Sequence, residues 1–236
     1  MNRAVNRADE LKANLAEVEE RIAKACEAAG RERNEVMLLA VTKTWPASDV
    51  EILYELGLRH FAENRDQEAS AKVGQLRHLG EARWHMVGRL QRNKAKSVVE
   101  WADQVDSVDS VRLAEALAKA AHARGKKLDV LLQVSIDGDT SRGGIAIADV
   151  AELAGVITRS GDLILRGAMT VAPLTMEPSQ AFEALASVVS GLRDDHPTAT
   201  RVSAGMSGDL EDAISHGSTC VRVGTALLGS RRLISP

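Results

Sequence analysis

The 236-residue sequence predicts an α/β fold: a single (β/α)8 TIM barrel with an extra N-terminal helix. After Gly30, short apolar runs alternate with amphipathic stretches in one unbroken series, and strict alternation of strands with helices indicates a parallel sheet. Eight such units in about 200 to 250 residues fit a barrel. A doubly wound open sheet is the alternative, but it usually carries a glycine-rich turn after its first strand. The turn here, TKTWPASD, contains no glycine.

The first expected element is the N-terminal helix, at about residues 8–29. Apolar residues from Leu11 to Ile22 recur at spacings of three and four among charged residues. That spacing gives a helix one apolar face. Gly30 is a typical residue for the end of such a helix.

The barrel follows at about residues 36–231. Its strands are expected at 36–43, 59–62, 84–88, 104–108, 128–136, 163–170, 201–204 and 219–224. Helices are expected between them at about 47–57, 64–79, 90–101, 110–124, 146–160, 178–194 and 207–216. No repeat or linker interrupts the series, so residues 1–236 are expected to form one domain.

Composition excludes several classes of function. Thirty basic against 33 acidic residues, with 3% aromatics, give neither the charge nor the stacking surface of a nucleic-acid binder. No apolar run approaches the roughly 18 to 20 residues that span a bilayer, and the N-terminus lacks a signal-peptide core. Cys26 and Cys220 suggest reduced thiols, and no zinc-binding spacing is present. We therefore expect a cytoplasmic protein without metal, membrane or nucleic-acid binding.

Lys43 is the first candidate functional residue. It ends the first predicted strand, and alternation places it on the same face as Leu39 and Val41. If that face is the barrel interior, the lysine loses hydration and its neutral amine is favoured. A neutral amine can form a Schiff base with an aldehyde. A lysine that merely extends to solvent at a strand end is the alternative.

Two small-residue segments follow the last two predicted strands. They are SAGMSG at 203–208 and RVGTALLG at 222–229. Barrels often bind phosphate with the loops after strands seven and eight, where backbone N–H groups approach the anion. Arg222 shares a strand face with Cys220 and is expected to point into the barrel mouth, where a charge needs partners. Ordinary tight turns and an internal ion pair are the alternatives.

These residues lie in segments that resemble the YggS-type pyridoxal phosphate homeostasis proteins, whose barrel is similar to the N-terminal domain of alanine racemase. The resemblance extends from about Leu38 to Arg231. Its segments are LLAVTKT around Lys43, HFAEN at 60–64, WHMVGRLQRNK at 84–94, DSVDS at 106–110, LRGAMT at 165–170, SAGMSGDLEDAI at 203–214 and GSTCVRVGTALLG at 217–229. The chain has Ala62, Ala204 and Leu228 where the family usually shows glycine, methionine and phenylalanine.

The resemblance implies the cofactor pyridoxal 5'-phosphate (PLP), held as a Schiff base on Lys43. Arg222 would face the pyridine nitrogen, and Asn64 and Met169 would line the ring. The residues implied in phosphate binding are Ser203, Gly205, Met206, Ser207, Gly224 and Thr225. No residue receives a certain catalytic role.

The same resemblance implies binding without robust catalysis. Two positive charges ~4 Å apart cost about 4 kcal/mol at an effective dielectric of ~20, so Arg222 would oppose protonation of the pyridine nitrogen. Racemisation needs a second proton donor, a tyrosine from another domain in alanine racemase. The only tyrosine here, Tyr54, is expected in a helix far from the barrel mouth. We therefore expect a protein of intracellular PLP homeostasis that buffers or delivers the cofactor.

Other interpretations stay open. The main one is a weak PLP-dependent amino-acid racemase, or another enzyme that forms a Schiff base. A phosphate-sugar aldolase that uses Lys43 is the second. A nucleic-acid role through Arg89, Arg92, Lys94 and Lys96 is the third. Expected partners are PLP and apo PLP-dependent enzymes, and the chain is expected to be a monomer or a weak dimer.

Overall fold

The computed structural model describes residues 2–230, with side chains from residue 7 onward, and within them eight parallel strands close a barrel. The predicted barrel end at residue 231 lies outside the described residues. The barrel strands are β1 (Met37–Val41), β2 (His60–Glu63), β3 (Arg83–Met86), β4 (Gln104–Val108), β5 (Leu128–Ser135), β7 (Leu163–Met169), β8 (Arg201–Ser203) and β9 (Cys220–Val223). Pairing of β4 with β5 and of β9 with β1 closes the ring. The predicted (β/α)8 fold is confirmed, and the open sheet is excluded.

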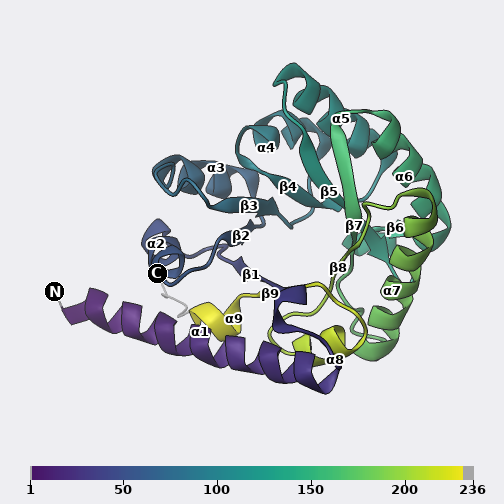
Figure 1. Ribbon diagram of the computed structural model, residues 1–236. Helices are drawn as coiled ribbons and strands as arrows, with labels where there is room; N and C mark the ends of the chain where they lie inside the picture. Colours follow the sequence, from purple (N-terminus) through teal and green to yellow (C-terminus); the bar gives the residue numbers. More distant parts are fainter. Residues whose placement is uncertain (1, 231–236) are drawn as a thin grey trace.

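Helices surround the barrel, as Figure 1 shows. They are α1 (Asn2–Ala28), α2 (Ala47–Glu55), α3 (Asp66–Gln75), α4 (Ala95–Trp101), α5 (Val111–Ala123), α6 (Val150–Arg159), α7 (Pro178–Asp195), α8 (Leu210–Ser215) and α9 (Thr225–Leu228). Short 3-10 turns are η1 (Arg33–Glu35), η2 (Arg92–Lys94), η3 (Thr140–Arg142) and η4 (Ile147–Asp149). A two-residue strand, β6 (Ile145–Ala146), pairs with the end of β5.

Several predicted boundaries are wrong by a few residues. The first strand ends at Val41, so Lys43 lies in the turn after it. The helix predicted at 207–216 begins only at Leu210, because Asp209 accepts a hydrogen bond from the Met206 N–H and shapes a turn there. Helix α9 was not predicted, since four residues are too few to show a helical period.

The strands separate two apolar regions. On β1, Leu38 and Ala40 belong to the large core between the barrel and its helices. Leu39 instead packs inside the barrel with Ala62 and Cys220, and Val41 lies against them. The alternation predicted for the first strand is therefore the observed one.

Polar side chains fill much of the remaining barrel interior. His85, Gln104, Asp106 and Arg222 are all buried, although interiors of such barrels are usually packed with branched apolar residues. Because each buried polar group needs a partner, these residues bond to one another or to backbone carbonyls. The polar interior leaves both barrel ends lined with groups that can bind ligands.

Helix α1 lies across α8 and α9 at the edge of the barrel (Figure 1). Its polar side chains bond to backbone carbonyls near the end of the chain: Arg7 to Leu228 O at 3.0 Å, Asn14 to Leu227 O at 3.0 Å and Arg21 to Ser207 O at 3.0 Å. The helix therefore fixes the loops that follow β8 and β9.

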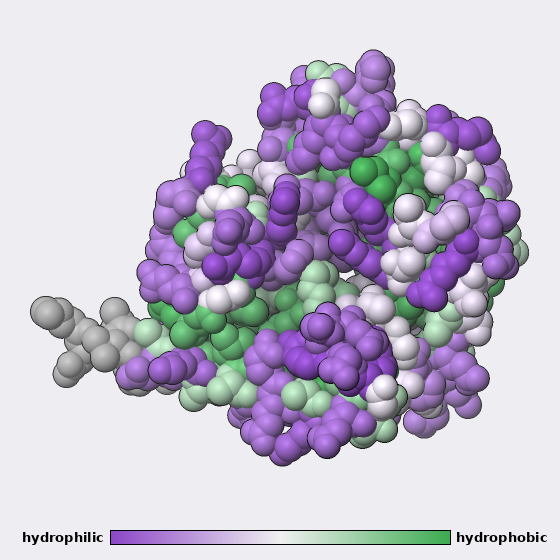
Figure 2. Space-filling view, in the orientation of Figure 1, coloured by the Kyte–Doolittle hydropathy of each residue, from purple (hydrophilic) through white to green (hydrophobic). Residues whose placement is uncertain are grey.

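Hydrophilic residues cover most of the face drawn in Figure 2, and hydrophobic residues show mainly where α1, α2 and α9 meet. Among the described helices, none is long and apolar enough to cross a membrane.

Candidate functional site

The ten predicted site residues lie on five neighbouring strands at one end of the barrel. Around the ring, the order is β2, β1, β9, β8 and β7, and the residues follow or end these strands at their carboxyl ends. Active sites of (β/α)8 barrels lie at this end. The fold therefore brings together residues that are up to 182 positions apart (43 to 225) in the chain.

Lys43 is half-buried, directly after the interior-facing end of β1. Its neighbour Thr42 faces the other way, and the Thr42 hydroxyl donates to Glu63 Oε1 at 2.7 Å. Lys72, from α3, donates to Thr42 O at 2.7 Å and to Glu63 Oε1 at 2.6 Å. The backbone that carries Lys43 is thus held by a buried ion pair outside the barrel wall.

The turn after Lys43 has an unusual backbone. Thr44 has a φ of 67°, in the left-handed region that non-glycine residues rarely adopt. The Thr44 N–H donates to the Glu68 carboxylate, again from α3. Since Glu68 and Lys72 lie one turn apart on the same helix, α3 fixes both sides of Lys43.

Burial and hydrogen bonding act in opposite directions on Glu63. Burial raises the pKa of its carboxyl, while the bonds from Lys72 and Thr42 lower it by a smaller amount. One oxygen, Oε2, is buried without a hydrogen-bond partner. Loss of the Lys72 ammonium would leave this carboxylate in a low-dielectric environment, where the charged form is unfavourable.

The two small-residue segments touch each other. The Ala226 N–H, at the start of α9, donates to the Ser207 hydroxyl at 3.2 Å. Gly205 has a φ of 90°, and an added Cβ would lie 2.6 Å from Ala213 Cβ, so only glycine fits there. Gly224 lies against Val41, and a Cβ added to Gly224 would lie 3.4 Å from the carbonyl oxygen of Val41. The two small-residue segments therefore adjoin the strand that precedes Lys43.

The N–H groups of the first segment are not all free. The Met206 N–H donates to Asp209 Oδ1 at 2.5 Å. An anion that uses this N–H must displace the carboxylate. The Ser207 hydroxyl already accepts from the Ala226 N–H at 3.2 Å, so its own O–H remains as a possible donor.

Arg222 is buried in the barrel and bonds only to neutral acceptors among residues 2–230. It donates to Ser203 Oγ at 2.7 Å and to Thr170 O at 2.6 Å. Burial lowers the pKa of Arg222 from its ordinary value. The internal ion pair that was the alternative for this residue is absent from the described residues. Burial also raises the pKa of the neighbouring Cys220 thiol to about 12, so the thiol stays protonated.

Other residues near the predicted strand ends do not join this site. Glu63 points out of the barrel toward α3. The His85 ring contacts His60, the first residue of β2, at 3.1 Å, and so lies toward the opposite end. Tyr54 accepts from the Glu81 N–H at 3.4 Å and packs against Arg59, also near the amino ends of β2 and β3. No tyrosine therefore lies near Lys43.

The basic run after β3 makes intramolecular contacts. Arg89 donates to Ser141 O at 3.0 Å, and Lys94 lies 4.0 Å from Asp66. Both residues line a groove of about 420 Å³ that also contains Asn64. These contacts give the run a structural role beside the candidate site.

Sequence reasoning missed Lys72, Glu68, Thr170 and Arg21. A signal existed for Lys72, because it lies three residues after Ala69 and four before Leu76, both of which are apolar and buried along α3 and its C-cap. Arg21 donates to the backbone carbonyl of Ser207, and the backbone carbonyl of Thr170 accepts from Arg222. Contacts to backbone carbonyls leave no pattern in the sequence.

The donor set fits a phosphorylated aldehyde. Lys43 supplies an amine, the segments after β8 and β9 supply hydroxyl and N–H donors, and the buried Arg222 guanidinium lies in the same region of the barrel. In the part of the chain that the structure describes, no group of three His, Cys, Asp or Glu side chains could hold a metal ion.

Comparison with known proteins gives one family model and several relatives. Residues 9–232 match the model described as alanine racemase, N-terminal domain. A Mycobacterium tuberculosis protein named pyridoxal phosphate homeostasis protein is 49% identical, over 98% of this chain and 96% of its own length.

Two solved structures are similar as well. A protein of unknown function from Bifidobacterium adolescentis is 35% identical with a TM-score of 0.89, covering 94% of this chain and 96% of its own. PipY from Synechococcus elongatus, solved with PLP bound, is 35% identical with a TM-score of 0.79. It covers 90% of this chain and 100% of its own.

Proposed function

The chain belongs to the alanine racemase N-terminal domain family and, within it, to the pyridoxal phosphate homeostasis proteins; from this premise we propose that it binds PLP and buffers or delivers it. The observation that carries the proposal is the position of Lys43. It follows β1 beside Gly224 and the segments after β8 and β9, at the barrel end where ligands bind.

Each predicted site residue has a role in this proposal. PLP supplies an aldehyde, which condenses with an amine and releases water. Lys43 provides that amine, and the network from α3 keeps its backbone in place. Arg222 would face the pyridine nitrogen, and Asn64 and Met169 would border the ring. Phosphate contacts would come from Ser203, Gly205, Met206, Ser207, Gly224 and Thr225.

Binding without robust catalysis follows from two features of the chain. Arg222 carries a buried positive charge, which opposes protonation of a nearby pyridine nitrogen. Tyr54, the only tyrosine in the sequence, lies near the amino ends of the strands. Two-base racemisation therefore lacks its second proton donor in this proposal.

We also propose a cytoplasmic location and transfer of PLP to apo PLP-dependent enzymes, by a monomer or a weak dimer. Both cysteines are free and buried, which suits a reducing compartment.

The test is the visible absorption spectrum of the purified protein after addition of PLP. The wild type is expected to show a violet-region band from covalently bound cofactor, and Lys43→Ala is expected to lose it. Lys96→Ala, which removes an exposed lysine on α4, is the matched control and is expected to keep the band. The proposal is wrong if the wild type shows no band, or if Lys43→Ala shows the same one.

Hydrogen exchange at Cα of alanine separates a carrier from a racemase. We expect the PLP-loaded protein to exchange this hydrogen no faster than free PLP at equal concentration. Faster exchange that disappears in Lys43→Ala would establish the racemase instead.

A further inference from the structure

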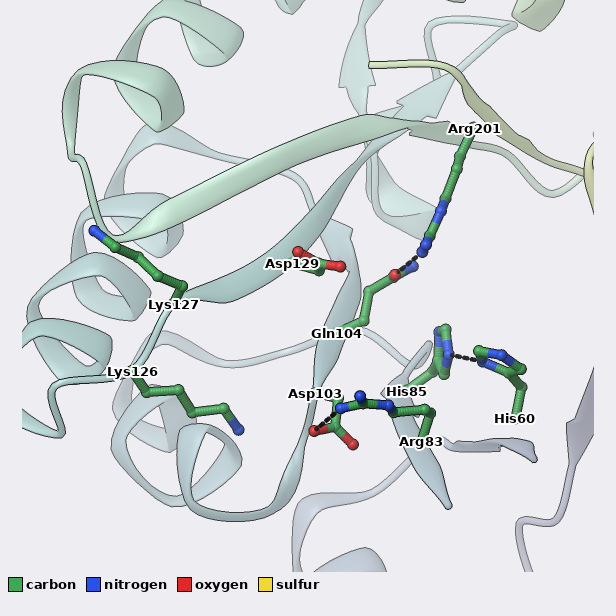
Figure 3. Close-up of a pocket in the computed structure, with 9 residues that line it drawn as sticks. All are labelled: His60, Arg83, His85, Asp103, Gln104, Lys126, Lys127, Asp129 and Arg201. Carbon is green, nitrogen blue, oxygen red and sulfur yellow. Dashed lines mark hydrogen bonds and ion pairs between the residues drawn. The ribbon is translucent and has the colours of Figure 1, made fainter. Parts of the chain in front are cut away.

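A second cavity lies at the opposite end of the barrel from Lys43. Its volume is about 380 Å³, within the ordinary range for small-molecule sites. Its lining residues, drawn in Figure 3, are His60, Arg83, His85, Asp103, Gln104, Lys126, Lys127, Asp129 and Arg201. Four of them, His60, Arg83, Gln104 and Arg201, are the first residues of their strands, so the cavity opens at the amino end of the barrel.

Both carboxylates that line the cavity already have partners. Asp129 lies 3.0 Å from the Arg166 guanidinium. Asp103 lies 3.6 Å from Arg83 and accepts from the Trp84 N–H at 2.9 Å. These contacts compensate the negative charge of the wall.

Two cations of the wall have no carboxylate partner among residues 2–230. Arg201 donates to Gln104 Oε1, and Lys126 donates to Ala102 O at 2.5 Å, both neutral acceptors. Burial lowers the pKa of Lys126, which shows that its charge is poorly solvated. Lys127, by contrast, lies 3.5 Å from Asp162 and points away from the other lining residues in Figure 3.

The inner wall of the cavity is ordered by a chain of hydrogen bonds. Gln104 accepts from Arg201 and donates to Asp106 Oδ1 at 2.7 Å. Asp106 lies 3.4 Å from His85 Nδ1, and His85 Nε2 lies 3.1 Å from His60. His85, Gln104 and Asp106 are buried, so Arg201 and His60 are held by a fixed interior. Such an arrangement is preorganised for a ligand.

We propose that this cavity is a second binding site, for a small oxyanion that carries a phosphate or carboxylate group. Arg201 and Lys126 supply two uncompensated positive charges, and the guanidinium fork suits either group. The volume of about 380 Å³ suits a small molecule. The site does not depend on the cofactor, because it shares no residue with the other end of the barrel.

His60 reports on this site. Burial, together with His85, Arg201 and Arg83, lowers the pKa of His60 to about 4, and Asp103 acts weakly in the other direction. A bound anion favours the charged imidazole, so we expect the pKa of His60 to rise by about 1 unit. The measurement is an NMR titration of the histidine rings at constant ionic strength, with inorganic phosphate, malonate or chloride added. The His60 signal is assigned from its loss in His60→Gln.

A response to phosphate assigns the site to phosphate groups, and a response to malonate alone assigns it to carboxylates. The Arg201→Gln/Lys126→Gln double variant is expected to weaken the response of the His60 pKa to added anion at least tenfold. If the double variant does not fold, Lys126→Gln alone is measured in its place. Lys96→Gln is the matched control. Lys43→Ala is expected to respond like the wild type, which separates this site from the cofactor site. No His60 response to either anion, or an equal response in the Lys126 and Arg201 variants, overturns the proposal.

Discussion

The two ends of the barrel use charged side chains differently. At the carboxyl end, the Glu63–Lys72 ion pair lies outside the strand wall and holds the backbone of Thr42, next to Lys43. At the amino end, Arg201 and Lys126 line the cavity itself and bond only to neutral acceptors among the described residues. The first arrangement holds the backbone next to Lys43, and the second leaves two positive charges without a carboxylate partner.

This difference shows how the same residue types acquire different roles. Removal of one partner of a buried ion pair leaves the other charge buried and unpaired, so the loss affects stability and geometry. A cation that faces a neutral oxygen stays undercompensated, so its removal affects ligand binding more than folding. Lysine and arginine at a barrel end therefore indicate function only when their partners are known.

The largest expected effect tests the buried ion pair. Lys72→Met leaves the Glu63 carboxylate buried and unpaired, and loss of one partner of such a pair costs about 3 to 5 kcal/mol. We expect the free energy of unfolding, measured in urea, to fall by that amount. The absorption band of bound PLP is also expected to weaken, because Thr42 O loses its donor.

The control for this prediction is the Lys72→Met/Glu63→Gln double variant. It removes both charges together, so we expect it to recover part of the lost stability. If Lys72→Met is as stable as the wild type, the pair has no role in holding the turn, and the contrast between the two barrel ends is lost.

A smaller effect is expected at Gly205. Gly205→Ala places a Cβ 2.6 Å from Ala213 Cβ at a φ of 90°, so both the contact and the backbone are strained. We expect a destabilisation of about 1 to 3 kcal/mol and weaker PLP binding, measured by thermal unfolding and by absorbance titration. Gly208→Ala in the same segment is the control, since nothing lies within 4 Å of its Cβ position and its φ is not positive. Equal effects of the two variants would contradict the prediction.

The last expected effect is a pH dependence from the amino end, which is small for each pH unit. His60 has a pKa of about 4 in the folded protein and 6.5 as its ordinary value. Between these values the unfolded chain binds a proton that the folded protein does not. The contribution of His60 to the free energy of unfolding is complete above pH 6.5. It decreases as the pH falls toward 4, with a slope below about 1.4 kcal/mol per pH unit.

We expect His60→Gln to show a shallower loss of stability over this range than the wild type, measured by urea unfolding at several pH values. Added phosphate is expected to make the wild-type slope shallower as well, because a bound anion stabilises the charged imidazole. Identical slopes for the two proteins would show that His60 is not the titrating group.

The sequence was sufficient to predict the barrel, because alternation of apolar runs and amphipathic stretches reports directly on strands and helices. The inward positions of Leu39, Cys220 and Arg222 followed from the two-residue period of a strand, and the structure has them there. The grouping of the predicted site residues followed from the rule that parallel strand ends meet at one edge.

What the sequence did not indicate depends on partners far away in the chain. Lys72 looks like any helix lysine until Glu63 and Thr42 are seen beside it. Arg201 begins a short strand, and its bond to Gln104 spans 97 positions. Helix boundaries at Leu210 and the short helix α9 depend on local hydrogen bonds that periodicity does not encode.

The contacts of α1 have a consequence for the order of assembly. Arg7 and Asn14 bond to Leu228 and Leu227 across 221 and 213 positions. Bringing such distant segments together carries a large loop-closure entropy and slows folding. During synthesis, α1 leaves the ribosome before the residues that it contacts, and it can bond to them only after β9 and α9 have emerged. The loops that α1 holds are therefore completed only after α9 has been translated, so a ribosome-bound chain without β9 and α9 has no finished site.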